Sequence, residues 1–476
     1  FKLILLRLPP TMLITLAPFP QWGHILPAVR LGKLLAHAGN VVHLATVSVM
    51  RTDVDNFLAT SPTAPLVVYY VDSSDQGRSL AASKGLAHLN TQDLALDEYF
   101  VESLYFAKEL RENTELLVSD GFVDLSGVSA SWSAALAVMC AMSFTAASQT
   151  FNHYYFPETE AKQEEPSVTT AKCSSNFYPR FLTFVFSCSI LEPEIPCNNP
   201  LLRFLGPVAL VDDHLSLGGR KNDYCPGTDS AGDTTSNSSG RKDKVLEEVF
   251  EWLKITHSQS KDGVIFVSIG SRVVFSRWQL SVLALALHDT KCRVVWCVHR
   301  LHPRVVYHWL PKEVKSTVNM SKEAFTKTAA APAVAPEQQR FFIRPWLPQS
   351  DIVKLREVCL VVTHAGWGSC CEAIGAGKKV MCLPFDADQP GNAKLLASAP
   401  LQVGTVVDPK DKSTFTRKKV LLSLETVLES RVFTKSAQDL TAELKKFCRE
   451  MWTPDKLRDS LRLGDYTKLT VTRKFH

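Results

Sequence analysis

The apolar positions of this chain fall into short continuous runs, separated by stretches with the spacing of a helix. Residues 12–17 (MLITLA) form a mostly apolar run, as expected of a strand buried on both faces. Over residues 25–38 the apolar positions gather near one side of a helix: Leu26, Val29, Leu31, Leu34 and Leu35. Gly39 and Asn40 end this helix, and residues 41–47 are the next apolar run. The β-α-β order predicts a parallel sheet with crossover helices.

The same alternation continues and then restarts after a polar stretch. In the first half, residues 116–119 and 182–187 are further apolar runs. Residues 218–240 are rich in Gly, Ser, Thr and Asp, cannot build a core, and are typical of a linker or surface loop. Beyond them the pattern predicts strands at 263–269, 293–298, 359–363 and 380–383, and helices at 245–254, 278–287 and 436–449.

Two blocks of this kind predict an α/β protein with two Rossmann-like domains facing each other across a cleft. We place the first domain at 1–213, the linker at 214–244 and the second domain at 245–450. The last segment, 451–476, is expected to pack back on the first domain. Ligands of such folds bind beyond the carboxyl ends of the strands, so the cleft is the expected binding site.

Composition narrows the class of protein but not its function. The chain of 476 residues is 45% hydrophobic and 21% charged, which is typical of a soluble globular protein. Its net charge of +5 is too small to indicate nucleic-acid binding. Its apolar runs are too short for a membrane span, and residues 1–10 lack the length and cleavage site of a signal peptide.

The 12 cysteines are scattered, with no C-x-x-C pair and no Cys/His cluster at zinc spacing. Many lie in apolar runs, which indicates buried reduced thiols and a reducing, cytoplasmic location. We expect no cofactor and no resident metal, and we expect a monomer.

Residues 346–389 carry the most informative pattern: WLPQSDIVKLREVCLVVTHAGWGSCCEAIGAGKKVMCLPFDADQ. The run CLVVT leads to His364, then to a glycine-containing turn and a helix expected to start near Ser369. Backbone N–H groups and the helix dipole make such a terminus a phosphate site. Ser369 and Glu372 also have the spacing of a capping box, so the local pattern leaves a cap and a ligand contact equally open. Asp388-Gln389, on pattern alone, is a polar turn.

This segment resembles the signature box of plant family 1 UDP-glycosyltransferases, with the family's length of 44 residues and no gap. The matching positions are Trp346, Pro348, Gln349, Thr363, His364, Gly366, Trp367, Ser369, Glu372, Gly377, Pro384, Asp388 and Gln389. The resemblance implies a GT-B fold whose first domain binds the acceptor and whose second domain binds the UDP-sugar. Weaker matches at 186–196, 204–208, 251–255 and 264–271 extend it over residues 12–450.

The resemblance also implies how the nucleotide is held. Trp346 would stack on the uracil, and Glu372 would hold the ribose hydroxyls. His364 and Ser369 would bind the diphosphate. The remaining nucleotide-binding positions in this expectation are Gln349, Gly366, Gly368 and Ser271.

The transferred sugar would lie at the end of the box. Trp367, Asp388 and Gln389 would line it, the last two by hydrogen bonds to its hydroxyl groups. Gln at the final position, in this family, favours glucose over galactose.

Four positions depart from the family's pattern. Gly368 stands where the family usually has an Asn that contacts a phosphate, and it keeps only a backbone N–H there. The other departures, Leu355 for His, Ala365 for Cys and Lys379 for Pro, do not touch the expected ligand.

The first expected strand-to-helix turn, PFPQWGHI, places His24 where a helix begins. The helix dipole disfavours an imidazolium there, so His24 should stay neutral and able to accept a proton. A lone histidine at a helix start is more often a satisfied surface residue, but this turn resembles the family's first loop, in which the histidine is the general base. A carboxylate must orient such a base. Asp120, at the end of LLVSD, matches the family's partner, and Asp124 is the rival.

The expected reaction is a single displacement that inverts the anomeric carbon without a metal, since the helix terminus meets the phosphate charge. Two D-x-D triplets, 53–55 and 386–388, keep a metal-held diphosphate open. A nucleotide-sugar binding protein without catalysis is the main alternative. A dinucleotide-dependent oxidoreductase is disfavoured because the first turn lacks G-x-G-x-x-G.

The acceptor is expected to be a small lipophilic molecule: a phenolic, flavonoid, terpenoid or cytokinin. A slight likeness to cytokinin O-glucosyltransferases lies in the Ser-Cys after Trp367 and in the run Asp-Gln-Pro-x-Asn at 388–392. The aromatic residues that are candidates to contact the acceptor are Trp22, Phe144, Phe151, Tyr154 and Tyr155.

Overall fold

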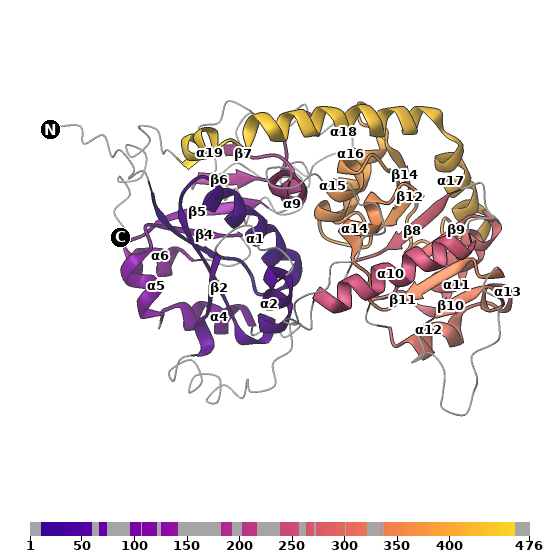
Figure 1. Ribbon diagram of the computed structural model, residues 1–476, viewed down its shortest axis with the longest axis horizontal. Helices are drawn as coiled ribbons and strands as arrows, with labels where there is room; N and C mark the ends of the chain where they lie inside the picture. The colour runs from indigo at the N-terminus through magenta and orange to yellow at the C-terminus, as the bar shows by residue number, and fades with distance from the viewer. Residues whose placement is uncertain are drawn as a thin grey trace, which may run out of the picture. The chain divides into compact units, whose positions relative to one another are not determined.

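A computed structural model of the chain describes residues 11–59, 66–73, 96–105, 107–120, 125–140, 182–192, 202–216, 239–256, 263–270, 273–299, 301–320, 335 and 338–461. By contact, the chain divides into two units: Phe1–Ser230 with Lys446–His476, and Ala231–Lys445. Each unit contains a seven-stranded sheet in which all neighbouring strands are parallel, with helices packed around it (Figure 1). Two Rossmann-like α/β domains, as the sequence predicts, are therefore confirmed.

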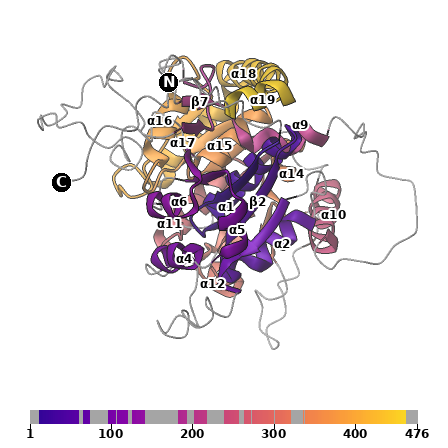
Figure 2. The ribbon, with the colours of Figure 1, turned by 90° about the vertical axis from the view of Figure 1, so that its left-hand side faces the viewer.

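Unit 1 has the strand order β3-β2-β1-β4-β5-β6-β7. The strands are β1 (Leu13–Ala17), β2 (Val41–Thr46), β3 (Leu66–Tyr70), β4 (Leu116–Ser119), β5 (Ala135–Cys140), β6 (Leu182–Val185) and β7 (Leu202–Phe204). Its helices are α1 (Trp22–His37), α2 (Arg51–Ala59), α4 (Leu96–Tyr105), α5 (Lys108–Asn113), α6 (Ser126–Trp132), α9 (Val211–Ser216) and α19 (Pro454–Leu461). Helix α1 packs on β2 and contacts α19 (Figure 2).

Unit 2 has the strand order β10-β11-β9-β8-β12-β13-β14. The strands are β8 (Val264–Ser268), β9 (Arg293–Cys297), β10 (Val318–Met320), β11 (Phe341–Arg344), β12 (Val358–Thr363), β13 (Lys379–Cys382) and β14 (Gly404–Val406). The helices are α10 (Ser239–Thr256), α11 (Arg277–Asp289), α12 (Pro303–Trp309), α13 (Lys312–Lys315), α14 (Gln349–Lys354), α15 (Trp367–Gly375), α16 (Gln389–Ala397), α17 (Arg417–Glu429) and α18 (Arg431–Met451), whose last residues belong to unit 1.

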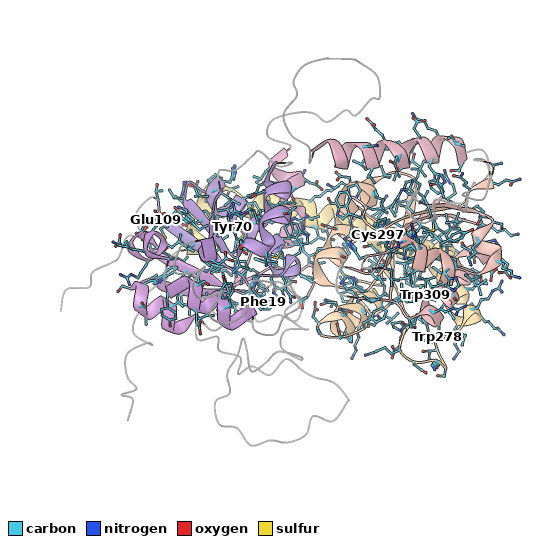
Figure 3. The ribbon with its side chains drawn as sticks, turned by 90° about the horizontal axis from the view of Figure 1, so that it is seen from below. Phe19, Tyr70, Glu109, Trp278, Cys297 and Trp309 are labelled. Atoms are coloured by element: carbon cyan, nitrogen blue, oxygen red, sulfur yellow. The ribbon has the colours of Figure 1, made fainter. Side chains whose placement is uncertain are left out.

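The central strands are buried on both faces, which explains their continuous apolar runs. Every residue of β4, β8, β9 and β13 is buried. Helices cover both faces of such a sheet, so period-two alternation would leave polar groups in a core. Burial also raises the pKa of the Cys297 and Cys382 thiols to about 12 (Cys297 is labelled in Figure 3). None of the nine described cysteines forms a disulfide.

Four predicted helix starts need correction. Helices α10 and α18 begin at Ser239 and Arg431, six and five residues before their predicted starts. Helix α1 begins at Trp22, three residues before the predicted start, so His24 lies inside its first turn. Pro27 lies within this helix and gives up one backbone hydrogen bond there, a cost that the buried face of α1 offsets. Helix α15 begins at Trp367, not near Ser369.

The chain around residue 450 returns to unit 1. The Trp452 indole Nε1–H donates to the carbonyl of Leu205 at 2.6 Å. In α19, Arg458 donates to the carbonyl of Ala38 at the end of α1, and Arg203 donates to the carbonyl of Ser460. Residues 462–476 and the predicted linker residues 217–238 lie outside the described part of the chain, while α9 and α10 occupy the two ends of the predicted linker.

Basic side chains at the amino ends of the unit 2 strands donate to helix C-terminal carbonyls. Arg293 donates to Leu253 of α10 at 3.0 Å, and Arg340 donates to His288 of α11 at 3.0 Å. Lys379 donates to Leu428 of α17 at 2.7 Å. These carbonyls have no partner within their helix, and a cation there also interacts favourably with the helix dipole. The lysine at position 379, where the family resemblance would have a proline, therefore has a structural role.

The apolar stretches of the described helices are too short or too interrupted by charge for any of these helices to traverse a bilayer.

Lys379→Met is expected to lower the free energy of unfolding by about 1–2 kcal/mol, because it keeps the buried stem and removes the charged hydrogen bond to Leu428. Urea denaturation measures this change. Lys418→Met, at an exposed position of α17, is the matched control and should stay within about 0.5 kcal/mol of the parent. Equal stabilities for the two variants would contradict the capping role of Lys379.

Candidate active site

The predicted site residues gather where the strand order of each sheet reverses. In unit 1 the reversal lies between β1 and β4, which pair with Ala17 opposite Ser119. In unit 2 it lies between β8 and β12, which pair with Thr363 opposite Ser268. Loops leaving two adjacent strands in opposite directions open a crevice at their carboxyl ends, where α/β folds bind ligands.

His24 and Asp120 meet at the reversal point of unit 1. The Nδ1 atom of His24 lies 2.9 Å from Oδ2 of Asp120, whose side chain is almost completely buried. The same Oδ2 accepts a hydrogen bond from the backbone N–H of Phe19 at 2.8 Å. The Phe19 ring, labelled in Figure 3, packs edge-on against the imidazole at a centroid distance of 5.5 Å. Phe19 thus contacts both members of the pair.

This geometry suits a histidine that acts as a base. With Nδ1 facing the carboxylate, Nε2 is the nitrogen that can accept a proton. Asp120 can stabilise the imidazolium that forms, and its backbone contact holds it in place. The rival, Asp124, lies outside the described residues.

His364 occupies the corresponding position in unit 2, directly after β12. Its ring lies between two glycines: a Cβ at Gly270 would lie 2.5 Å from the imidazole Cε1, and one at Gly366 would lie 2.5 Å from Nε2. Gly270 also has a φ of +71°, which a residue with a side chain rarely adopts. Both glycines are therefore required for this placement of the ring. Burial lowers the pKa of His364 to about 4, so the ring is neutral at physiological pH.

The N-terminus of α15 has no cap from its own N-cap residue, because that residue is Gly366. By contrast, α11 has a complete capping box formed by Ser276 and Gln279, and α17 is capped by Thr416. Ser369 is the third residue of α15 and cannot be its N-cap, so the capping-box alternative for Ser369 and Glu372 is wrong. The first N–H groups of α15 and its dipole suit an anion.

Gln349, at the start of α14, connects the residues around this terminus. Its Nε2 donates to Oε2 of Glu372 at 2.8 Å and to the Ser369 hydroxyl at 3.0 Å. Its Oε1 accepts from the Ser268 hydroxyl, at the end of β8, at 2.7 Å. One amide thus orients both Ser369 and Glu372, the residues for which the sequence left a capping role and a ligand contact equally open.

Gln389 is the first residue of α16 and Asp388 directly precedes it, and each is held by a neighbour. The Asn392 amide donates to Oδ2 of Asp388 at 2.6 Å. Gln389 is buried; its Oε1 accepts from the backbone N–H of Phe385, and its Nε2 donates to Asp386 at 2.9 Å. Both acidic residues of the 386–388 triplet therefore accept amide protons. Among the described residues, no group of three or more His, Cys, Asp or Glu side chains is arranged to hold a metal.

The remaining predicted donor-binding residues differ in exposure. Trp346 is 37% exposed, whereas Trp367 is 3% exposed. Gly368 is exposed, and a Cβ there would meet nothing within 4 Å, so packing does not require glycine at this position. Ser271 lies outside the described residues.

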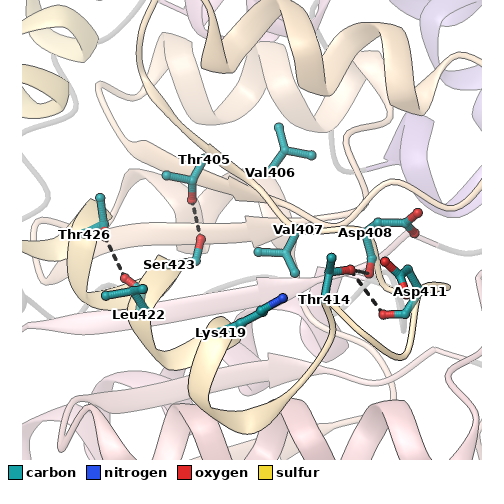
Figure 4. A pocket seen from close by; sticks show the side chains of 10 residues that line it. All are labelled: Thr405, Val406, Val407, Asp408, Asp411, Thr414, Lys419, Leu422, Ser423 and Thr426. Atoms are coloured by element: carbon teal, nitrogen blue, oxygen red, sulfur yellow. Dashed lines mark hydrogen bonds between the residues drawn. The ribbon is translucent and has the colours of Figure 1, made fainter.

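A separate hollow of about 410 Å³ lies beside β14 and the first turns of α17 (Figure 4). Its lining includes Thr405, Asp408 and Lys419, and a hydrogen bond joins Thr405 to Ser423 across it. None of the predicted site residues lines this hollow.

Three residues of the site were missed from the sequence. Phe19 and Ser268 contribute a backbone N–H and a hydroxyl at strand ends, and no local pattern marks such contacts. Asn392 carries a signal, because it is the last residue of the run Asp-Gln-Pro-x-Asn, three residues after the box ends.

Solved structures share this fold over nearly the whole chain. The crystal structure of Medicago truncatula UGT71G1 complexed with UDP-glucose has a TM-score of 0.63 at 17% identity, covering 94% of this chain and 97% of that chain. Os79 from O. sativa, in complex with U2F and trichothecene, has a TM-score of 0.62 at 18% identity, covering 94% and 98%. The fold is therefore GT-B, as expected.

Sequence comparisons find one family of similar proteins. The family model for UDP-glucoronosyl and UDP-glucosyl transferase matches residues 241–446. The chain is 23% identical to UDP-glycosyltransferase 90A1 of Arabidopsis thaliana, covering 92% of this chain and 91% of the relative. It is 24% identical to UDP-glycosyltransferase 84A1 of the same plant, covering 80% and 79%. The chain is therefore similar over most of its length to UDP-glycosyltransferases, enzymes that transfer a sugar from a UDP-sugar, and matches their family model over much of its second unit.

Proposed function

We propose that this enzyme transfers glucose from UDP-glucose to a hydroxyl group of a small lipophilic acceptor, with inversion of the anomeric carbon and without a metal. The observation that carries the proposal is the pairing of His24 with Asp120 at the reversal point of the unit 1 sheet. A nucleotide-sugar binding protein has no need of a buried carboxylate that orients a histidine.

The uridine diphosphate is bound by the residues around the start of α15. Trp346 stacks on the uracil, and Glu372, oriented by Gln349, accepts hydrogen bonds from the ribose hydroxyls. The diphosphate lies at the helix N-terminus, where the N–H groups after Gly366, including that of Gly368, face it. His364, Ser369 and Ser271 are the side chains that complete the phosphate site.

The glucose is bound at the start of α16, beside Trp367. Asp388 and Gln389 bind its hydroxyl groups. The Gln389 Nε2 carries two protons, so it can donate to Asp386 and to a sugar hydroxyl at once. Glucose is proposed as this sugar because the final glutamine of the box favours it in the family.

The chemical step is one displacement at the anomeric carbon. His24 takes the acceptor hydroxyl proton at Nε2, and Asp120 stabilises the positive charge that forms on the ring. General-base catalysis of this kind raises the rate by a factor on the order of 10²–10⁴. The acceptor oxygen attacks the anomeric carbon. The bond between that carbon and the diphosphate oxygen of UDP breaks as the new bond forms. The N–H groups of α15 stabilise the negative charge that develops on the departing diphosphate.

The acceptor is a phenolic, flavonoid, terpenoid or cytokinin, bound by unit 1. Of the aromatic candidates, Trp22 is described: it lies two residues before His24 and packs edge-on against Phe57 at 5.6 Å. Phe144, Phe151, Tyr154 and Tyr155 lie outside the described residues. The monomeric state and the cytoplasmic location, which suits the buried thiols, stay predictions.

Mass spectrometry of products from UDP-glucose and a mixed panel of these acceptor classes tests the proposal. At least one acceptor is expected to gain the mass of one hexose, with release of UDP and with a metal chelator present. Tight UDP-glucose binding with no product from any acceptor would favour the binding-protein alternative.

In the same assay, His24→Ala is expected to lower kcat by about 10²–10⁴, because the acceptor proton has no base to accept it. Affinity for UDP-glucose, measured by calorimetry, should be unchanged. His37→Ala, at the exposed end of the same helix, is the matched control and should transfer at the parent rate. Transfer by His24→Ala at the parent rate would remove the base assignment.

Glu372→Ala is expected to weaken UDP binding by about 10- to 100-fold, the loss of hydrogen bonds to a charged acceptor. Thermal stability should change little, since Glu372 does not cap α15. Glu425→Ala, on an exposed face of α17, serves as the control. Unchanged UDP affinity in Glu372→Ala, measured by calorimetry, would show that this carboxylate does not touch the ribose.

UDP-glucose affinity is expected to rise as the pH falls from 7 to 5. The pKa of His364 is about 4 without ligand, and a neighbouring diphosphate favours the charged ring, so the complex has the higher pKa and takes up a proton. The rise should be on the order of three- to tenfold. His364→Gln should give a flat profile; the same slope in that variant would exclude His364 as the titrating contact.

A further inference from the structure

We propose that Asn392 is a positioning residue, which fixes the sugar-binding carboxylate of Asp388 and ties it to the loop that binds the diphosphate. The inference rests on the proposed function, because that proposal gives Asp388 and the loop their roles. It concerns a residue outside the 44-residue box, three positions after its end.

Asn392 lies in the first turn and a half of α16 and has no exposed surface. Its Nδ2 donates to Oδ2 of Asp388 at 2.6 Å and to the carbonyl oxygen of Ala365 at 2.9 Å. Its backbone N–H also donates to the Asp388 carbonyl at 3.0 Å. The two side-chain bonds use both protons of one amide, so they hold α16 and the loop after β12 in a single arrangement.

Ala365 is the residue between His364 and Gly366, so its carbonyl belongs to the backbone that leads into α15. It has a φ of +67°, a left-handed conformation that costs free energy for an alanine. The bond from Asn392 holds the carbonyl of this strained residue. The amide that holds Asp388 therefore also holds the loop that leads into α15.

Asparagine suits this position better than aspartate or alanine. An aspartate has no amide protons and would place a second carboxylate beside Asp388. An alanine would leave a carbonyl and a carboxylate without this buried donor. A carboxylate accepts several hydrogen bonds, so the bond to Asn392 sets the direction of Asp388 while the group can still accept from a sugar hydroxyl.

The test compares the affinities of UDP and UDP-glucose, because their ratio isolates the part of binding that depends on the sugar. Calorimetry on Asn392→Ala, Asp388→Ala and the double variant is expected to give the same change in each: a loss of about tenfold in UDP-glucose affinity relative to UDP. Coupled residues show such non-additivity. Lys394→Ala, at an exposed position of α16, is the matched control and should keep the parent ratio.

Thermal denaturation checks that each variant is folded. If Asn392→Ala does not fold, Asn392→Ser, which keeps one hydrogen-bond donor, replaces it. In the serine variant, the affinity for UDP-glucose relative to UDP is expected to fall by about threefold. An unchanged ratio in Asp388→Ala would show that the proposed sugar contact is wrong. If Asp388→Ala changes the ratio, two results would overturn the inference about Asn392. One is the parent ratio in the folded Asn392 variants, and the other is additive effects in the double variant.

Discussion

Both halves of this enzyme depend on one constraint: every strand of a parallel sheet delivers its carboxyl end to the same edge. Where the strand order reverses, the chain leaves two adjacent strands in opposite directions, and the side chains that follow can point at a common ligand. In unit 1 this brings His24 within 2.9 Å of Asp120, which lies 96 positions later in the chain. In unit 2 it places His364 beside Gly270, and Gln349 beside Ser268.

The same constraint orders the helix ends. Helix C-termini meet the amino ends of the strands, and there Arg293, Arg340 and Lys379 donate to carbonyls in the last turn of a helix. At the opposite edge, α15 begins with Gly366 and has no cap from that residue. Some of the protein's basic side chains thus donate to carbonyls at helix C-termini, while the N-terminus of α15 suits an anion.

The sequence predicted what local patterns encode and missed what only the folded chain brings together. Continuous apolar runs identified β4 to the residue and β8, β9 and β12 to within a residue at each end, because strands buried on both faces need no alternation. Strands β10 and β14 have three residues each, too few to show a pattern. The start of α15 was misplaced because Ser-x-x-Glu has the spacing of a cap, whereas the fold uses Ser369 and Glu372 as partners of Gln349. The contacts of Phe19, Ser268 and Asn392 join distant segments, so spacing along the chain does not reveal them.

The most direct measurement of the central claim is the crystal structure of the protein with UDP bound. We expect the two phosphates at the N-terminus of α15, within hydrogen-bond distance of His364 and of the N–H groups that follow Gly366, with the uracil on Trp346. Electron density for UDP away from this helix, for example in the hollow beside β14, would contradict this expectation.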